Sequence, residues 1–237
     1  MPAAKKAPKK YQPKGLTILF EDRDVIVVDK PCGLLSIGTG REHVRTVHSI
    51  LVDYVRKGDP RSRHRVYIVH RLDRETSGIL ILAKSEEAKT YLQAHWTENE
   101  KRYLAVAHGT LAEKSGSIGS YLAENSALNV YSTNDSSLGK WAETRYTVLK
   151  EFKGLSLLDV HILTGRKHQI RVHLSDLGHP LLGDRKYGKQ HDAQPTLLLH
   201  ARSLTFTHPV NGRRLNFTAP VPDAFARLVG EFTLPAG

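Results

Sequence analysis

The sequence contains a single cysteine, Cys32, so the chain cannot form an internal disulfide. Such sparing use of cysteine is typical of a reducing compartment, and we expect the protein to be cytoplasmic. No apolar run approaches the length needed to span a bilayer, and the chain does not open with a signal-peptide pattern. These absences argue against a disulfide-stabilised secreted protein and against a membrane protein.

Several ligand-binding signatures are missing as well. The chain has no Walker-type phosphate loop, no dinucleotide-binding fingerprint and no zinc-ligand spacing. Thirteen histidines are present, but the densest cluster, His161, His168 and His173, does not have the spacing of a familiar zinc site. We therefore expect no metal, and we interpret the histidines as scattered over a basic surface.

The chain carries a large excess of positive charge. Its formal net charge of +11 accompanies an ordinary apolar content of 40% and charged content of 25%. This balance indicates an acidic partner, and nucleic acid fits better than an anionic membrane surface. Residues 1–15 hold five lysines and three prolines, which predicts a disordered basic arm. The arm either aids solubility or attracts phosphates, and the sequence favours neither role.

The order of the predicted elements indicates an α+β fold. Beyond the arm, strands mostly follow strands, which is typical of a largely antiparallel mixed sheet with flanking helices and not of a doubly wound parallel sheet. We expect residues 16–237 to form one domain. Residues 111–140, rich in Ser, Gly and Asn, are expected to be irregular or to form weak hairpins. The predicted strands are 24–30, 101–108, 142–150, 155–163, 196–200, 203–208 and 214–218, and the predicted helices are 43–57, 85–98 and 167–177.

The turn of residues 70–77 is the most informative part of the sequence. It lies between two apolar runs, Val66–Val69 and Ile79–Ala83, and carries two arginines, a histidine and two carboxylates, with Asp73 near its centre. Turns between buried strands usually consist of Gly, Asn, Pro or Ser, and loops held by strands often carry catalytic groups. On residue type alone, Asp73 is either a catalytic carboxylate or a residue that caps the local backbone.

A second charge-dense segment, Leu163–His173, follows a predicted strand. An arginine at the edge of an apolar helix stripe can reach a buried carboxylate with two hydrogen bonds. Arg171 is therefore a candidate partner that keeps Asp73 ionised, although a cationic stripe more often faces water. Tyr103, at the start of a strand, is either a core aromatic or a residue that stacks on a base or moves a proton.

These residues resemble the motifs of the RluA-type pseudouridine synthases. The resemblance covers residues 16–220, and its motifs occur in the expected order. They are Lys30-Pro-x-Gly33, His70-Arg-Leu-Asp73-x-x-Thr76-Ser-Gly78 with Leu82-Ala-Lys84, Lys101-x-Tyr103, Ala142-x-Thr-x-Tyr146, Thr164-Gly-Arg-x-His-Gln-Ile-Arg-x-His173, Gly178-His-Pro-x-x-Gly-Asp184 and Leu199-His-Ala201.

The resemblance implies an isomerase that converts uridine in RNA to pseudouridine on the pseudouridine synthase fold, with a central RNA-binding cleft and no cofactor. Asp73 matches the catalytic aspartate, Tyr103 the active-site tyrosine and Arg171 the basic partner of the aspartate. Arg71 matches the residue that fills the space left when the target base is extruded from its stack. The further residues expected to contact RNA are His70, Arg166, Lys167 and His168, and those expected to line the uracil pocket are Ile170 and Leu199.

Two departures from the family accompany this resemblance. Many relatives carry an S4-type RNA-binding domain ahead of the catalytic one, and we expect this chain to lack it because the arm is too short. Cys32 stands where serine is commoner. We expect a monomer that acts on ribosomal or transfer RNA. The alternatives are a non-catalytic RNA-binding protein or RNA chaperone on the same fold, and an enzyme that acts on DNA.

Overall fold

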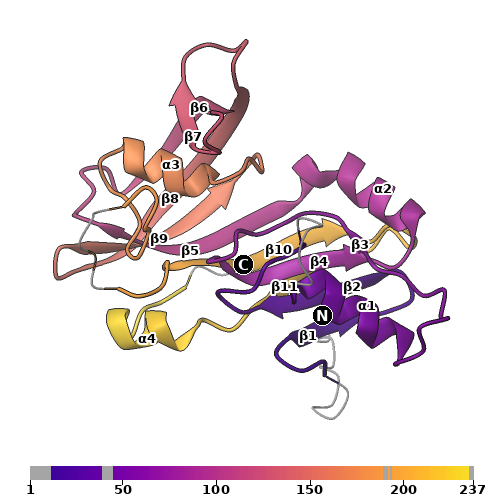
Figure 1. Cartoon of the computed structure of the whole chain (residues 1–237). Helices are drawn as coiled ribbons and strands as arrows, with labels where there is room; N and C mark the ends of the chain where they lie inside the picture. The colour runs from indigo at the N-terminus through magenta and orange to yellow at the C-terminus, as the bar shows by residue number, and fades with distance from the viewer. Residues whose placement is uncertain (1–11, 39–44, 189–191, 193, 235–237) are drawn as a thin grey trace. The chain divides into compact units, whose positions relative to one another are not determined.

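The computed structural model describes residues 12–38, 45–188, 192 and 194–234. The chain divides into two compact units (Figure 1). The first unit comprises the chain up to Asn99 together with Ser203–Ala219, and the second comprises Glu100–Arg202 together with the chain from Pro220 onward. Most of the predicted basic arm, residues 1–11, lies outside the described residues. The prediction of one catalytic domain over residues 16–237 stays a prediction.

The first unit is a largely antiparallel sheet with two helices. Its strands are ordered β1-β2-β4-β10, with β11 paired to β10 and the short β3 paired to β4. The strands are β1 (Thr17–Glu21), β2 (Val25–Lys30), β3 (Tyr67–Ile68), β4 (Ser77–Ala83), the second half of β10 (Leu199–Thr207) and β11 (Arg214–Thr218). Val25, Val27, Ile79 and Ile81 pack in its core, so the apolar runs seen in the sequence are the central strands.

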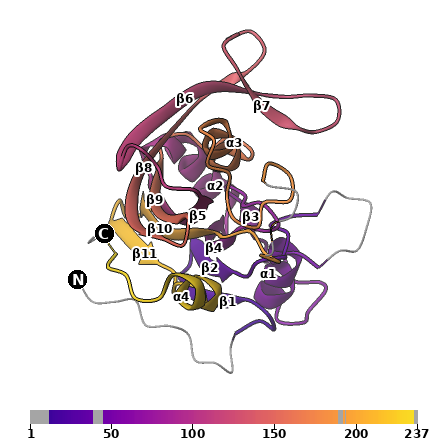
Figure 2. The same cartoon turned by 90° about the vertical axis from the view of Figure 1, so that its left-hand side faces the viewer.

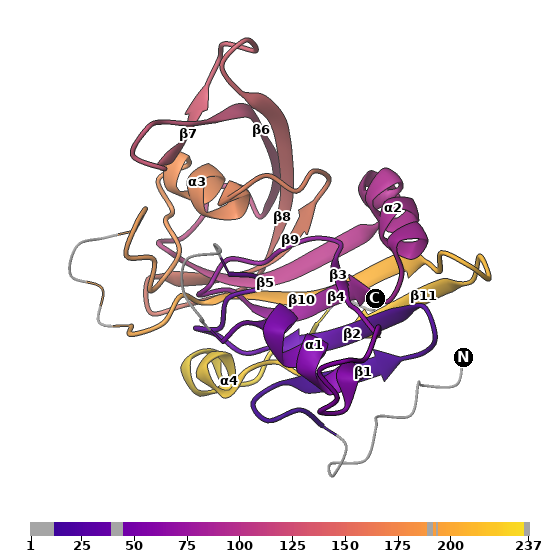
Figure 3. The ribbon, with the colours of Figure 1, turned by 45° about the vertical axis from the view of Figure 1, so that its right-hand side comes forward.

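Both helices of the first unit begin at a side chain that caps the helix N-terminus. Helix α1 (Val47–Arg56) starts with a capping box in which the Thr46 and Ser49 side chains each bond the other's backbone. Helix α2 (Glu86–Ala94) starts at Ser85, whose hydroxyl accepts from the Ala88 N–H. Figure 3 shows α1 in front of β1 and β2, and the Tyr54 hydroxyl on this helix donates to the Glu21 carboxylate on β1 at 2.8 Å.

The second unit contains a longer sheet that is largely antiparallel. Its strands are ordered β10-β5-β9-β8-β6-β7, to which β10 contributes its first half. Figure 2 shows β6 and β7 as a long ribbon beside helix α3, and the core cluster of Leu122, Val130, Ala142 and Val172 joins that ribbon to the helix. The elements are β5 (Glu100–His108), β6 (Ser115–Glu124), β7 (Val130–Thr133), β8 (Lys140–Phe152), β9 (Leu155–Ile162), α3 (Gln169–Asp176) and α4 (Asp223–Val229).

The α+β fold with a largely antiparallel sheet is confirmed, but two local predictions were wrong. Residues 111–140, predicted to be irregular or to form weak hairpins, contain the antiparallel pair of β6 and β7, so the hairpin alternative is confirmed. The two strands predicted at 196–200 and 203–208 are the single strand β10. The second predicted helix ends at Ala94 and is followed by a separate 3₁₀ turn, Trp96–Glu98.

None of the helices in the described part of the chain is long and apolar enough to cross a membrane.

Candidate active site

The charged turn 70–77 of the first unit connects β3 to β4. The two strands pair in register, with Ile68 opposite Leu82, so both ends of the turn are fixed by the sheet. Leu72 and Thr76 are buried, Asp73 is half-buried, and Arg71, Arg74 and Glu75 are exposed. The turn is closed by a backbone hydrogen bond from the Thr76 N–H to the Asp73 carbonyl at 3.2 Å.

The loop after β2 clamps this turn through its backbone. The Ser36 hydroxyl donates to the Leu72 carbonyl at 2.9 Å and accepts from the Leu72 N–H at 3.0 Å. The Gly33 N–H donates to the Arg74 carbonyl at 2.9 Å, and Arg74 Nε returns a bond to the Gly33 carbonyl at 3.3 Å. Asp73 therefore lies between two residues whose backbone is fixed by a distant segment, and such support holds a reactive group in place.

A fully buried lysine lies behind the clamp. Lys30 Nζ donates to the carbonyls of Pro31, Leu34 and Arg74 at 3.1, 2.7 and 3.1 Å. Three acceptors match the three N–H groups of an ammonium. Burial lowers the pKa of Lys30 to about 8, against the opposing influence of nearby charged groups that include Asp73. The sequence showed Lys30 only as part of a motif, and its role as an anchor of the turn was missed.

His70 starts the turn and has well-defined internal contacts. Its ring stacks on Trp96 with centroids 4.3 Å apart, and its Nε2 accepts from the Ile81 N–H at 3.2 Å. The accepting nitrogen carries no proton, so the other ring nitrogen, Nδ1, carries it in the neutral ring. These contacts fix the entry to the turn, and the predicted contact of His70 with RNA stays a prediction.

In the second unit, Arg171 on α3 forms a buried ion pair with Asp184. Nε and Nη2 donate to the two carboxylate oxygens at 2.7 and 2.8 Å. Burial by itself raises the pKa of Asp184, but the bonds and charge of Arg171 and the N–H groups of Tyr187 and Lys186 hold it below its usual value. Asp184 was quoted in a motif without a role. The predicted pairing of Arg171 with Asp73 joins residues of different units and stays a prediction.

His168 and Tyr187 continue this network. His168 takes up a left-handed backbone conformation at the start of α3, and its Nδ1 lies 2.7 Å from the Tyr187 hydroxyl. That hydroxyl also accepts from the Val130 N–H at 3.2 Å, and the Arg171 guanidinium lies over the Tyr187 ring, 5.1 Å from its centroid. Tyr187 was not predicted as a site residue, because nothing in its local sequence pattern links it to α3.

Gln169 holds the loop that carries Arg166. Its Oε1 accepts from the Thr164 hydroxyl and from the Arg166 N–H at 2.8 and 3.0 Å. Its Nε2 donates to the Glu143 carbonyl and the Thr144 hydroxyl, both at 2.9 Å. All four hydrogen-bonding positions of the buried amide are used, so the loop is fixed relative to β8.

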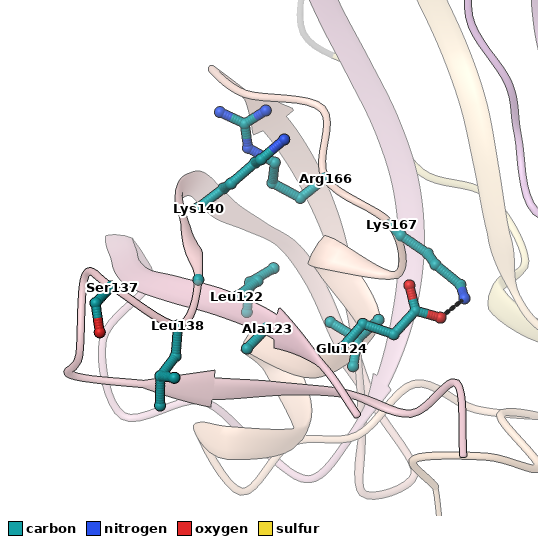
Figure 4. Close-up of a pocket in the computed structure, with 10 residues that line it drawn as sticks. Leu122, Ala123, Glu124, Ser137, Leu138, Lys140, Arg166 and Lys167 are labelled. Carbon is teal, nitrogen blue, oxygen red and sulfur yellow. Dashed lines mark hydrogen bonds and ion pairs between the residues drawn. The ribbon is translucent and has the colours of Figure 1, made fainter. Parts of the chain in front are cut away.

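The remaining predicted site residues lie in two groups of the second unit. Tyr103 on β5 is half-buried and packs against the core cluster that contains Ile170 and Leu199. Arg166 and Lys167 line a surface pocket of about 460 Å³, where Arg166 Nε donates to the Trp141 carbonyl and Lys167 pairs with Glu124 (Figure 4). Within this unit, then, the structure brings Tyr103, Ile170 and Leu199 together.

One side-chain group has the composition of a metal site. Asp22, Asp24 and His208 of the first unit offer ligand atoms within 4.8 Å of one another. His208 Nδ1 accepts from the N–H groups of Val210 and Asn211, both at 3.2 Å, so in the neutral ring the proton is on Nε2, which lies 2.9 Å from the Asp22 carboxylate. These bonds connect two turns of the unit, and they account for the arrangement without an ion.

The sequence is similar to the family model described as RNA pseudouridylate synthase, which matches residues 24–176. An uncharacterized RNA pseudouridine synthase of Mycobacterium bovis is 36% identical over 221 residues, 88% of this chain and 70% of the relative. A ribosomal large subunit pseudouridine synthase D of Nitrosomonas europaea is 38% identical over 230 residues, 90% of this chain and 64% of the relative.

Two solved human structures have a similar fold. Human RNA Pseudouridylate Synthase Domain Containing 4 matches with a TM-score of 0.74 at 24% identity, covering 92% of this chain and 94% of that one. Human RNA Pseudouridylate Synthase Domain Containing 1 matches with a TM-score of 0.70 at 26% identity, covering 90% and 86%.

Proposed function

Since this chain belongs to the RNA pseudouridylate synthase family and is an RNA pseudouridine synthase, we propose that it modifies ribosomal RNA and that Asp73 initiates the reaction. The reaction breaks the bond between uracil N1 and ribose C1′ and forms a bond between C5 and C1′. A proton leaves C5 and N1 gains one, so no atom is gained or lost.

The proposal for Asp73 rests on the hydrogen bonds that fix the backbone of its turn. The carboxylate belongs to a half-buried residue, while the backbone on either side is bonded by Ser36, Gly33 and the Lys30 ammonium. A fixed carboxylate beside buried positive charge can act as a nucleophile or a base without reorganising. An ionised carboxylate is suited to attack on C1′, to addition at uracil C6 and to elimination to a glycal.

The other residues are assigned roles around Asp73. Tyr103 is proposed to stack on the uracil and transfer a proton, and its half-buried position beside Ile170 and Leu199 supports an apolar uracil pocket. Arg71 is exposed and has no hydrogen bond or ion pair within the described part of the chain, which suits a side chain that enters the stack of an RNA helix.

The surface that follows α1 supports binding to a phosphate backbone. Lys57, Arg61, Arg63 and Arg65 are all exposed, and the bonds that Arg65 makes go to backbone carbonyls of Ser62 and His64. Asp59 is the acidic residue of this loop. Cations that lack carboxylate partners attract phosphates and make the affinity for RNA depend on salt.

Ribosomal RNA is the proposed substrate because two relatives with that designation align along most of the chain. The second, of Zymomonas mobilis, is a ribosomal large subunit pseudouridine synthase D that is 33% identical over 94% of this chain. Modification of transfer RNA in its place would contradict the proposed substrate and leave the activity intact. We propose further that the enzyme works as a monomer in the cytoplasm, a reducing compartment that suits its single exposed cysteine.

The test uses total RNA from a strain that lacks the protein. Purified wild type should convert defined uridines, mapped by carbodiimide-block primer extension, and Asp73→Asn should lower the rate by at least about 10³-fold. Asp53→Asn, which neutralises an exposed carboxylate on α1, is the matched control and should keep the wild-type rate. An Asp73→Asn variant with a normal rate contradicts the catalytic assignment. If that variant is inactive yet complements the deletion strain, the biological role is RNA binding or chaperoning instead of modification.

A further inference from the structure

A pocket in the second unit has no role in the proposed chemistry. It lies between the β6–β7 ribbon, the turn that leads into β8 and the loop before α3, and its volume is about 460 Å³ (Figure 4). This volume lies in the range of about 300–1,000 Å³ that small-molecule sites occupy. The lining residues are Leu122, Ala123, Glu124, Val130, Ser137, Leu138, Gly139, Lys140, Arg166 and Lys167.

Two cations at one end of the pocket lack acidic partners. Lys140 and Arg166 are both exposed, and neither forms an ion pair with any residue that the structure describes. Arg166 is oriented by the bond from its Nε to the Trp141 carbonyl at 3.0 Å, which leaves its two terminal amino groups for a ligand. Figure 4 draws both cationic head groups at the same end, away from the pair of Lys167 and Glu124. Neighbouring cations without a carboxylate are suited to a phosphate group.

The rest of the pocket is apolar. Leu122 and Val130 are buried at its base, and Leu138 lines its rim with 61% of its surface exposed. The exposed side chain of Leu138 extends the apolar surface that Leu122 and Val130 provide. The lining therefore combines an anion-binding end with an apolar surface.

The walls of the pocket are rigid. Gly139 passes so close to β6 that a Cβ atom there would lie 2.9 Å from the backbone of Leu122. Asp135 holds the same turn by accepting from the Ser137 N–H at 2.8 Å and the Ser137 hydroxyl at 2.6 Å. On the opposite wall, Gln169 fixes the Arg166 backbone at 3.0 Å. A site formed before binding loses little entropy when a ligand enters.

We propose that this pocket binds one unpaired nucleotide of the substrate RNA, distinct from the uridine that reacts. Lys140 and Arg166 hold its phosphate, and its base lies on the apolar surface formed by Leu122, Val130 and Leu138. In a nucleotide, the charged phosphate lies close to the flat face of the base. This arrangement matches a lining with cations at one end and apolar side chains in the remainder. The site would select RNAs that present an unpaired nucleotide beside the target stem. This inference rests on the proposed function, because it takes RNA to be the substrate.

The test uses a ligand that the enzyme cannot modify. A fluorescein-labelled oligocytidylate of about ten nucleotides contains no uridine, and its affinity is measured by fluorescence anisotropy at low salt. Lys140→Ala and Arg166→Ala should each raise its Kd about tenfold, the loss expected for one charge-assisted hydrogen bond. Arg145→Ala is the matched control. Arg145 lies on the same strand as Lys140 at an odd-numbered position, so it projects from the opposite face, and the Kd should stay within about twofold.

The Leu138→Ser variant distinguishes a pocket that binds a whole nucleotide from a surface that binds only its phosphate. The substitution removes apolar surface and no charge, so it should raise the Kd about fivefold if a base lies on Leu138. A Kd equal to that of the wild type for Leu138→Ser, or for both cation variants, overturns the inference. If hexaglutamate displaces the probe at lower concentration than unlabelled oligocytidylate does, the inference is overturned and the pocket is assigned to an acidic protein segment. Because the probe carries no uridine, these results do not depend on whether total RNA is modified, and the proposed function can fail separately.

Discussion

The turn 70–77 and the segment 164–173 both follow a strand, and both carry a dense run of charged and titratable side chains. In the turn, Arg71 and Arg74 are exposed, and the structure is held through the backbone by residues of another segment. In the segment, Gln169, Arg171 and His173 are buried and are held through their side chains.

The difference shows that charge density in a sequence does not by itself identify a substrate site. A polar side chain that is buried must be hydrogen-bonded inside the protein, so it becomes part of the scaffold. A turn whose backbone is fixed elsewhere can leave exposed arginines for a ligand. Arg171 is thus a structural residue through Asp184, in addition to any catalytic role.

Breaking the scaffold should have the largest effect on stability. Asp184→Ala leaves the Arg171 guanidinium buried without its bidentate partner, and we expect the free energy of unfolding to fall by about 3–5 kcal/mol in urea denaturation. Glu75→Ala, an exposed carboxylate of the turn, should change it by no more than about 0.5 kcal/mol. If Asp184→Ala and Glu75→Ala lower the free energy of unfolding equally, the buried ion pair does not stabilise the protein more than the exposed side chains of the turn do.

The buried lysine behind the turn should make stability and turnover change in opposite directions with pH. The pKa of Lys30 is lowered from 10.5 to about 8, so between these values the unfolded chain binds more protons than the folded one. This group should therefore increase stability by up to about 3 kcal/mol as the pH rises through that window. Turnover should decrease over the same range, because a neutral amine has one fewer N–H to donate to the three carbonyls around the turn.

The measurement for Lys30 is kcat and chemical denaturation at intervals from pH 7 to 10.5. Lys30→Met cannot titrate, so it should lack both the inflection near pH 8 and the gain in stability. If Lys30→Met retains the same two pH profiles, another group is responsible for them.

Loosening the clamp should affect catalysis more than binding. Ser36→Ala removes both hydrogen bonds to Leu72, and we expect a decrease of about 1–3 kcal/mol in stability and roughly a tenfold lower kcat. The Kd for RNA, measured by filter binding, should change less than twofold, because Ser36 is buried and cannot touch a phosphate. A variant that binds RNA more weakly and keeps its kcat would show that the clamp does not position Asp73.

The smallest expected effect concerns the exposed cations. Replacing Arg61, Arg63 and Arg65 by Ala should reduce the slope of log Kd against log salt by about 0.7–0.9 for each RNA phosphate that is no longer neutralised, with kcat unchanged. Lys167→Ala should reduce it less, because Lys167 already pairs with Glu124. If Lys167→Ala reduces the slope as much as the triple variant does, RNA must replace Glu124 as the partner of Lys167.

The sequence left open whether residues 111–140 are irregular or form hairpins, and tertiary contacts decided this by compensating for poor local propensity. Residues 115–124 are rich in glycine and serine, yet β6 is ten residues long. The Tyr146 and Trp141 rings of β8 lie against Gly116 and Gly119, where a Cβ atom would be 3.0 and 2.7 Å from the nearest ring carbon. Aromatic side chains on the neighbouring strand thus cover the glycines and stabilise the pairing, which no local pattern reveals.

The sequence by itself determined the α+β class, the positions of β2, α1 and β11, and the turn that carries Asp73, because side-chain periodicity and capping act over a few residues. The tertiary structure alone decided what holds that turn and what Arg171 bonds. Lys30 lies 44 residues from the Arg74 carbonyl, Ser36 lies 36 residues from the Leu72 carbonyl, and Asp184 lies 13 residues from Arg171. Hydrogen bonds between segments depend on where the chain returns in space, and that is set by packing of the whole fold.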